Sequence, residues 1–378
     1  MANASSPPRL SLQFLDGLRG LAALFVTLHH ARLLLWEGYA GGYQKHPETY
    51  SPLMKFMALG MSIFKEGHAA VLFFFVLSGF AIHLSYAARI KKDAAAPFDY
   101  GNYLLRRARR IYPPFLLAVL VTYLLDRVGM AQGYAIYVQK TPYEVINNNF
   151  VPDHSLPTLL GNLAFLMRNV VPTWGMNTPL WSLSYEWWFY MVYPALFFLT
   201  RRSITLATAT VVLLFIASFF GPLWQGLFLR PIFSYLLSWW LGALLADLYI
   251  GRFSLRFAFL TPLIVLLPLA HRLGRGSTII VDTLMAFGFV GVLALCFHLS
   301  TTGKSLKLLE KLKPMGDFSY SLYVLHCPIF VLLSGFLMAH NQGNLPAHFG
   351  WAFLAVFVAV GVAYLAHLMV EKPFTRKK

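Results

Sequence analysis

The chain has 378 residues, of which 58% are hydrophobic and only 12% are charged, whereas soluble domains carry roughly 25% charged residues. This composition excludes a water-soluble globule, because a bilayer is the solvent that accepts so much apolar surface, and in a bilayer the backbone is satisfied by helices. The net charge of +16 falls in short segments between apolar runs, which excludes a nucleic-acid surface and indicates orientation in a membrane, with attraction to anionic lipids or an anionic donor.

Apolar runs that can span a bilayer recur along the whole chain. A span needs about 20 mostly apolar residues, and about ten such runs are present. We predict an all-α, polytopic transmembrane helical bundle that forms a single membrane-embedded domain over residues 1–378. The predicted spans cover residues 15–36, 68–88, 111–128, 180–199, 204–221, 230–250, 256–271, 279–300, 317–338 and 349–370.

The basic residues predict how these spans are oriented. Lys and Arg are roughly twice as frequent in the loops on the side of the N terminus as in the loops opposite, which places both termini in the cytoplasm. The first run is too long for a signal-peptide core and lacks a clear cleavage site, so we expect it to be retained as a span. The expected location is the inner or plasma membrane of the cell, as a multi-pass protein.

The segments between the spans include one short apolar stretch and two long outer loops. Residues 157–170 predict a re-entrant or surface helix, and residues 37–67 and 129–179 form the loops. The second loop fits either a binding surface for a sugar or other polar acceptor, or a plain solvated connection. Its polar and aromatic residues are Asn147, Asn148, Asn149, Asp153, His154 and Trp174.

Ionisable residues inside the first predicted span are the first candidates for chemistry, because charges in a membrane are costly. Arg19 and His30 are eleven positions apart, which is about 20° past three full helical turns, so they share a face about 16 Å apart along the axis. If Arg19 lies near the cytoplasmic boundary, His30 lies near the middle of the membrane. An imidazole there suits a general base or a packing hydrogen bond.

The second span and the loop that follows it hold two further candidates. Ser78-Gly79 allows close helix packing or lines a ligand path, and packing is the more ordinary interpretation. Arg107 and Arg110 lie three apart in the sequence Arg106-Arg107-Ala-Arg109-Arg110-Ile-Tyr-Pro, so both face one way on a helical turn. Paired guanidinium groups fit phosphates well, although charge placement for topology also explains basic residues here.

The fourth span opens with Trp181 and carries Ser182, Glu186 and Tyr190 at helical spacing, which predicts one polar stripe. A carboxylate in so aromatic a helix needs a partner. Glu186 either orients and charge-pairs with His30, as the third group of a nucleophile–base arrangement does, or forms a structural ion pair with an arginine.

The ninth span reads Ser319-Tyr320-Ser-Leu-Tyr323-Val-Leu-His326, with Ser319, Tyr323 and His326 on one face. These side chains line a substrate channel or form hydrogen bonds between helices. The two cysteines, Cys296 and Cys327, lie inside predicted spans as small core residues, and they provide neither a disulfide framework nor zinc spacing. We expect no metal site.

Several of these motifs together resemble the acyltransferase 3 family of integral membrane acyltransferases, from Leu15 to the closing Glu371-Lys372-Pro373. In family order they are Leu-Asp-Gly-Leu-Arg19-Gly with His30 at Arg-x10-His, Phe-Phe-x-x-Ser78-Gly79, Arg107-x-x-Arg110-Ile-Tyr-Pro, Trp181-Ser-Leu-x-x-Glu186 and Ser-Tyr320-Ser-x-Tyr323-x-x-His326.

The resemblance implies O-acyl transfer, usually of acetyl from acetyl-CoA at the cytoplasmic face to a hydroxyl of a carbohydrate or similar acceptor. It implies catalytic roles for His30 and Glu186, and donor binding by Arg19, Ser78, Arg107 and Arg110. Substrate contacts are expected from Trp181, Ser182, Tyr190, Tyr320, Tyr323 and His326. An acyl intermediate on Tyr190 or Tyr323 is an alternative to direct transfer.

A rival hypothesis is a transporter or flippase that uses the intramembrane His and Glu for proton-coupled transport. The chain shows no inverted repeat, and its arginine pair suits phosphates, so acyl transfer is favoured. A receptor or scaffold explains none of the polar stripes.

Overall fold

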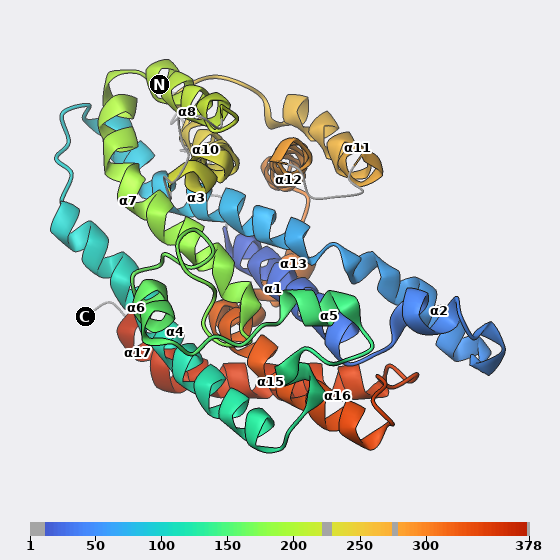
Figure 1. Ribbon diagram of the computed structural model, residues 1–378. Coiled ribbons are helices and arrows are strands. Elements are labelled where there is room, and N and C mark those ends of the chain that lie inside the picture. Colours follow the sequence, from blue (N-terminus) through green and yellow to red (C-terminus); the bar gives the residue numbers. More distant parts are fainter. Residues whose placement is uncertain (1–11, 221–228, 274–278, 376–378) are drawn as a thin grey trace.

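The computed structural model describes residues 12–220, 229–273 and 279–375, and these residues form helices joined by loops, with no strand among them (Figure 1). The long helices are α1 (Gln13–Leu34), α3 (Gly67–Lys92), α4 (Tyr100–Ala131), α7 (Trp181–Arg202), α8 (Ile204–Ala217), α10 (Leu229–Ile250), α12 (Ile279–Thr301), α15 (Ser319–His340) and α16 (Gly350–Ala366). The predicted all-α fold is confirmed. Nine of the ten predicted spans fall mainly on one helix each, whereas residues 256–271 fall on η6 (Phe257–Val265) and α11 (Leu266–Leu273).

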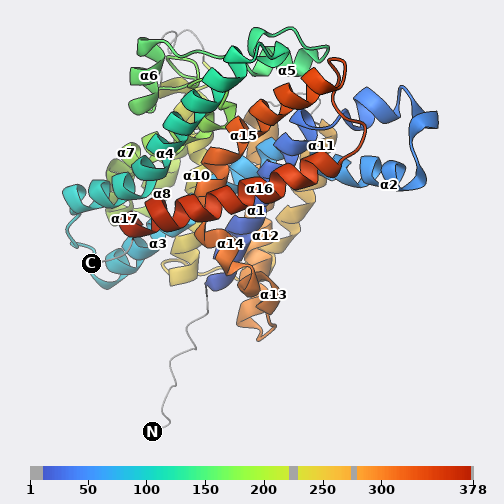
Figure 2. The same ribbon diagram turned by 90° about the horizontal axis from the view of Figure 1, so that it is seen from below.

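The shorter helices connect or flank these. They are α2 (Pro52–Gly60), α5 (Glu144–Asn149), α6 (Leu156–Leu163), η6 (Phe257–Val265), α11 (Leu266–Leu273), α13 (Lys307–Lys311), α14 (Lys313–Asp317) and α17 (Lys372–Thr375). Residues 157–163 of the stretch predicted as a re-entrant or surface helix lie in α6, whereas residues 164–170 mostly form turns. Both α5 and α6 lie toward one end of the molecule, and α13 lies at the other end (Figure 2).

Within the described residues, six helices are long and apolar enough to cross a membrane: α3, α4, α10, α12, α15, and α16 together with the turns that follow it. The remaining four predicted spans fall into two kinds. The helix α8 and the stretch Phe257–Leu273 are apolar but shorter. The helices α1 and α7 carry the polar residues of the predicted site, which lowers their hydropathy. The count of ten spans and the cytoplasmic termini therefore stay predictions.

The outer helices expose large apolar side chains, as a bundle surrounded by lipid requires. On α4, Leu116, Leu120 and Leu124 follow one another at every fourth position and are 46%, 54% and 52% exposed, whereas Phe115 is fully buried. Residues four apart lie on one face of a helix. This stripe therefore faces away from the core of the protein.

Glycines bring the central helices into backbone contact. A Cβ atom at Gly79 of α3 would lie 1.8 Å from the carbonyl oxygen of Trp239, and one at Gly242 of α10 would lie 1.9 Å from that of Val76. Only a residue without a side chain fits at either position, because such distances are far below van der Waals contact. The packing role that we favoured for the Ser78-Gly79 pair therefore applies to Gly79.

The helix α1 lies at the centre of the arrangement and packs against α3, α13, α14, α15 and α16. Its glycines again allow this, because a Cβ atom at Gly17 would lie 1.9 Å from the carbonyl oxygen of Leu309. Arg19 and His30 project from this helix, so the contacts of α1 decide what surrounds both.

Candidate active site

Two pockets lie at opposite ends of α1, and together they contain every predicted site residue except His326. We call them the inner pocket, which includes Arg19, and the outer pocket, which includes His30. The names follow the predicted orientation, in which Arg19 lies on the cytoplasmic side. Val71 and Tyr323 line both pockets, so these two side chains form part of the wall between them.

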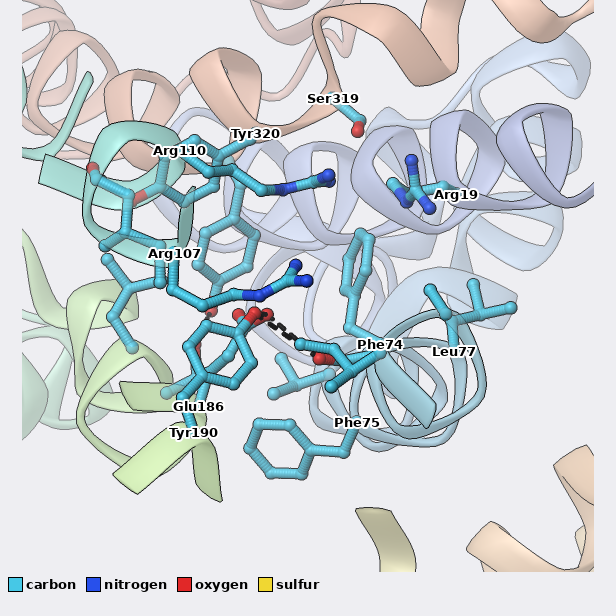
Figure 3. A pocket seen from close by; sticks show the side chains of 18 residues that line it. Arg19, Phe74, Phe75, Leu77, Arg107, Arg110, Glu186, Tyr190, Ser319 and Tyr320 are labelled. Carbon is cyan, nitrogen blue, oxygen red and sulfur yellow. Dashed lines mark hydrogen bonds between the residues drawn. The ribbon is translucent and has the colours of Figure 1, made fainter. Parts of the chain in front are cut away.

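The inner pocket gathers the predicted arginines. Arg107 and Arg110 extend from α4 toward the middle of the pocket, and Arg19 approaches from α1 (Figure 3). Glu186 is the carboxylate among the described residues that line it. Three guanidinium groups face one carboxylate, so the pocket has an excess of positive charge.

These arginines differ in whether they already have a partner. Arg19 forms an ion pair of 3.0 Å with Asp16, three residues earlier in α1. Among the described residues, Arg107 and Arg110 form no ion pair, and Nε of Arg107 is buried without a hydrogen-bond partner. The Arg107 guanidinium lies 5.7 Å from the centre of the Tyr190 ring, which fixes its position by a cation–π contact. Two neighbouring guanidinium groups without a counter-ion suit an anionic ligand.

Glu186 accepts hydrogen bonds from α3 and from its own helix. The hydroxyl of Ser78 donates to its Oε1 at 3.1 Å, and the hydroxyl of Tyr190 donates to the same oxygen. The indole N–H of Trp239 donates to Ser78 at 3.3 Å. The polar stripe predicted on α7, formed by Ser182, Glu186 and Tyr190, thus faces the inner pocket. On α3, Ser78 lines the same pocket, whereas its neighbour Gly79 packs against the backbone of α10.

The predicted pairing of Glu186 with His30 is not what the structure shows. Glu186 lies in the inner pocket and His30 in the outer one, and the hydrogen bonds of each go to other groups. The ion pair between Glu186 and an arginine, which was the alternative, is also not formed among the described residues. The positions of His30 in α1 and of Glu186 in α7 were therefore not sufficient to predict whether the two side chains are in contact.

The side chain beside His30 is His326 and not Glu186. Nε2 of His326 lies 3.2 Å from Nδ1 of His30, and Nδ1 of His30 lies 2.9 Å from the carbonyl oxygen of Val26. A carbonyl can only accept, so Nδ1 of a neutral His30 carries the proton. Nδ1 of His326 donates in the same way to the carbonyl of Leu322 at 2.9 Å, which leaves its Nε2 as an acceptor. The single Nδ1–H of His30 is therefore shared between the Val26 carbonyl and Nε2 of His326.

This pattern leaves Nε2 of His30 with its lone pair available. Among the described residues no group forms a hydrogen bond with that atom, and the imidazole lines the outer pocket. A neutral imidazole with one nitrogen held and the other open is the arrangement of a general base.

The tyrosines and Ser182 connect the two pockets. The Tyr323 hydroxyl donates to the carbonyl of Pro179 at 2.9 Å and lies 2.7 Å from the Ser182 hydroxyl. The Tyr320 hydroxyl donates to the carbonyl of Ile111 at 3.0 Å, which ties α15 to α4 beside Arg110. Ser182 and Tyr320 line the inner pocket as predicted, and Tyr323 lines both pockets.

Trp181 lies in the outer pocket, with His68 stacked on its ring at 5.5 Å between centroids and 17° between planes. His68 also contacts Asp282 of α12 at 2.9 Å through Nε2, and Tyr235 donates to the same carboxylate oxygen at 2.9 Å. We had not predicted roles for His68 or Asp282. The sequence signal was present, because both are ionisable residues in or beside apolar runs.

The second outer loop divides between the two roles that we left open. Asn148 and Asn149 line the outer pocket beside His30. The other residues serve the fold instead, since Asn147 bonds to Thr141 at 2.8 Å and His154 contacts Asp126 at 2.9 Å. The indole of Trp174 donates to the carbonyl of Val119 at 3.0 Å.

No group of three or more His, Cys, Asp or Glu side chains with the geometry of a metal site occurs among the described residues.

Comparison with known proteins identifies the family. A family model described as "Acyltransferase domain" matches residues 12–368. Acyltransferase MdmB of Streptomyces mycarofaciens is 27% identical over 406 residues, which cover 98% of this chain and 93% of that protein. Protein 2 in picA locus of Rhizobium radiobacter is 26% identical over 189 residues, which cover 48% of this chain and 80% of that protein. No solved structure matches. The chain belongs to the acyltransferase 3 family of integral membrane acyltransferases.

Proposed function

We propose that this acyltransferase moves an acetyl group from acetyl-CoA, bound in the inner pocket, to a hydroxyl of a carbohydrate or similar acceptor, bound in the outer pocket. The observation that carries the proposal is that two pockets with different chemical groups lie at the two ends of α1. An arginine pair without counter-ions lies in one pocket, and an imidazole with one open nitrogen lies in the other.

Donor binding follows from the charges of the inner pocket. Arg107 and Arg110 would hold the phosphates of CoA, and Arg19 adds positive charge from the facing helix. The hydrogen bonds from Ser78 and Tyr190 occupy Oε1 of Glu186, and this carboxylate forms no ion pair with either arginine among the described residues. The pantetheine arm is thin enough to extend along α1 toward the wall that Tyr323 and Val71 form.

Transfer itself is an acyl exchange between sulfur and oxygen. Nε2 of His30 takes the proton of the acceptor hydroxyl while that oxygen bonds to the thioester carbonyl carbon. The C–S bond then breaks, and the proton passes from His30 to the CoA sulfur. His326 keeps the His30 ring in place by accepting from its Nδ1–H. A relay in which Tyr323 carries the acetyl group between the pockets remains the alternative route.

The rival hypothesis of proton-coupled transport is supported neither by the family description nor by the name of the MdmB relative, because both indicate acyl transfer.

We also propose that the protein lies in the cytoplasmic membrane, because the proposed donor, acetyl-CoA, is a cytoplasmic metabolite.

The test is transfer by purified wild-type and His30→Ala protein in lipid nanodiscs with acetyl-CoA labelled in the acetyl group. We expect His30→Ala to lose transfer by roughly 100-fold or more while binding acetyl-CoA as the wild type does. His340→Ala removes an exposed imidazole of α15 and is the matched control. Near-normal transfer by His30→Ala would refute the proposal, as would a wild type that binds no acetyl-CoA.

A further inference from the structure

The outer pocket contains positively charged side chains that transfer to a neutral hydroxyl compound does not require. Two arginines, Arg32 and Arg168, line it together with three histidines, and no carboxylate is among its described lining residues. The nearby carboxylates have other partners: Glu66 lies 3.3 Å from His271, and Asp282 binds His68 and Tyr235. Neither arginine forms an ion pair among the described residues.

Arg32 lies in the last turn of α1, two positions beyond His30. Its Nε is buried and has no hydrogen-bond partner among the described residues. Glu66 acts on Arg32 through space without forming an ion pair with it. A buried guanidinium donor without an acceptor is unfavourable, and an oxygen of a ligand in this pocket would satisfy it.

Arg168 reaches the same pocket from the long outer loop. Its φ of 63° is left-handed, which is uncommon for a residue with a side chain, and its backbone N–H donates to the carbonyl of Val171 at 2.7 Å. The guanidinium lies 5.5 Å from the centre of the Trp181 ring. The loop therefore adopts a costly backbone conformation that places the Arg168 guanidinium over the Trp181 ring. Both side chains line the pocket that also contains His30.

We infer that the acceptor carries a negatively charged group, a carboxylate or a phosphate, close to the hydroxyl that receives the acyl group. Arg32 and Arg168 bind that group, since planar guanidinium groups pair with carboxylate and phosphate oxygens through two hydrogen bonds. This inference rests on the proposed function and narrows its acceptor from any hydroxyl compound to an anionic one.

The experiment compares three soluble acceptors with labelled acetyl-CoA and the purified full chain: methyl glucoside, which is neutral, methyl glucuronide, which carries a carboxylate, and glucose 6-phosphate. We expect kcat/KM for one anionic acceptor to exceed that for methyl glucoside at least tenfold. The preferred anion distinguishes a carboxylate from a phosphate.

Arg168→Asn and Arg32→Gln are expected to remove this preference and to leave KM for acetyl-CoA unchanged. Asn tolerates the left-handed backbone at position 168, so the first variant tests charge rather than folding. Arg127→Gln removes an exposed arginine of α4 outside the pocket and is expected to keep the preference. Equal use of neutral and anionic acceptors, or a preference that survives both pocket substitutions, would overturn the inference.

A second arm uses the native acceptor in labelled membranes of cells that produce the wild type or His30→Ala. The His30-dependent product is released from lipid and passed over an anion exchanger. Retained product supports the inference, and a product that passes through as a neutral compound overturns it while leaving the proposed function intact. Absence of any His30-dependent label, in contrast, contradicts the proposed function.

Discussion

The imidazoles of His326 and His30 are in contact although the two residues lie 296 positions apart in the sequence. This contact could not be predicted in the way that the features of one helix can. The spacing of Arg19 and His30 along one helix could be predicted, because helical geometry fixes it. The partner of His30 could not, because it depends on which helices pack against α1. The helix α15, which carries His326, does so, whereas α7, which carries Glu186, packs mainly against α3, α8 and α10.

His326 should act by positioning His30 and not by touching either substrate. We expect His326→Leu, which removes the acceptor nitrogen at similar volume, to lower kcat roughly 10- to 100-fold with little change in either KM. His326→Gln offers an amide oxygen in place of Nε2 and should recover part of kcat. Steady-state kinetics on both variants test this, and equal losses in the two would show that His326 serves packing alone.

Arg107 and Arg110 should act on the donor. Each hydrogen bond to a charged group contributes about 1.5–3 kcal/mol, so Arg107→Gln or Arg110→Gln should raise KM for acetyl-CoA by roughly 10- to 100-fold. Arg109→Gln removes an exposed arginine that lies between them in sequence but outside the inner pocket, and it should leave that KM near normal. The measurement is KM for acetyl-CoA, and an equal rise in all three variants would contradict donor binding by the pair.

Arg168 shows where residue patterns stop being informative. It lies in a loop without helical or strand periodicity, and nothing in the neighbouring sequence indicates that its backbone is left-handed or that Trp181 lies beneath it. His68 and Asp282 differ in this respect, because an ionisable residue in or beside an apolar run can be recognised in the sequence as a candidate site residue.

The helices themselves were predictable because apolar runs of sufficient length leave few alternatives in a bilayer. Nine of the ten predicted spans became mainly one helix each, residues 256–271 became two shorter helices, and the first half of the apolar stretch 157–170 became α6. The order of helices around α1 was not predictable, since it depends on contacts such as that of Gly79 with the backbone of α10.

The contact between α3 and α10 should depend on Gly79. In Gly79→Ala the added methyl group would meet the carbonyl of Trp239 at 1.8 Å, so the two helices must separate, at a cost of about 1–3 kcal/mol. Thermal unfolding in detergent should show a lower midpoint for Gly79→Ala than for the wild type. Ser85→Ala, at an exposed position of the same helix, should keep the wild-type midpoint, and similar midpoints for all three proteins would show that the contact adapts freely.

At the scale of the whole molecule, orientation is the property that the charge pattern predicts and that labelling can check. Both native cysteines are buried, so the wild type gives a low background with membrane-impermeant thiol reagents. With both termini in the cytoplasm, Lys140→Cys in the outer loop should be labelled in intact cells. Ser305→Cys, which is exposed between α12 and α13, should be labelled only after the cells are opened, and the reverse pattern would invert the proposed topology.

The phenol of Tyr323, anchored by Pro179 and Ser182 where the two pockets meet, has a consequence for the cell as well as for catalysis. An enzyme that receives its donor from one compartment and its acceptor from the other brings water deep into the bilayer from both faces. A continuous water column would let protons and sodium ions run down their gradients. If the proposed transfer is correct, a bulky side chain held at that junction would interrupt such a column and would keep the membrane impermeable to ions during acyl transfer.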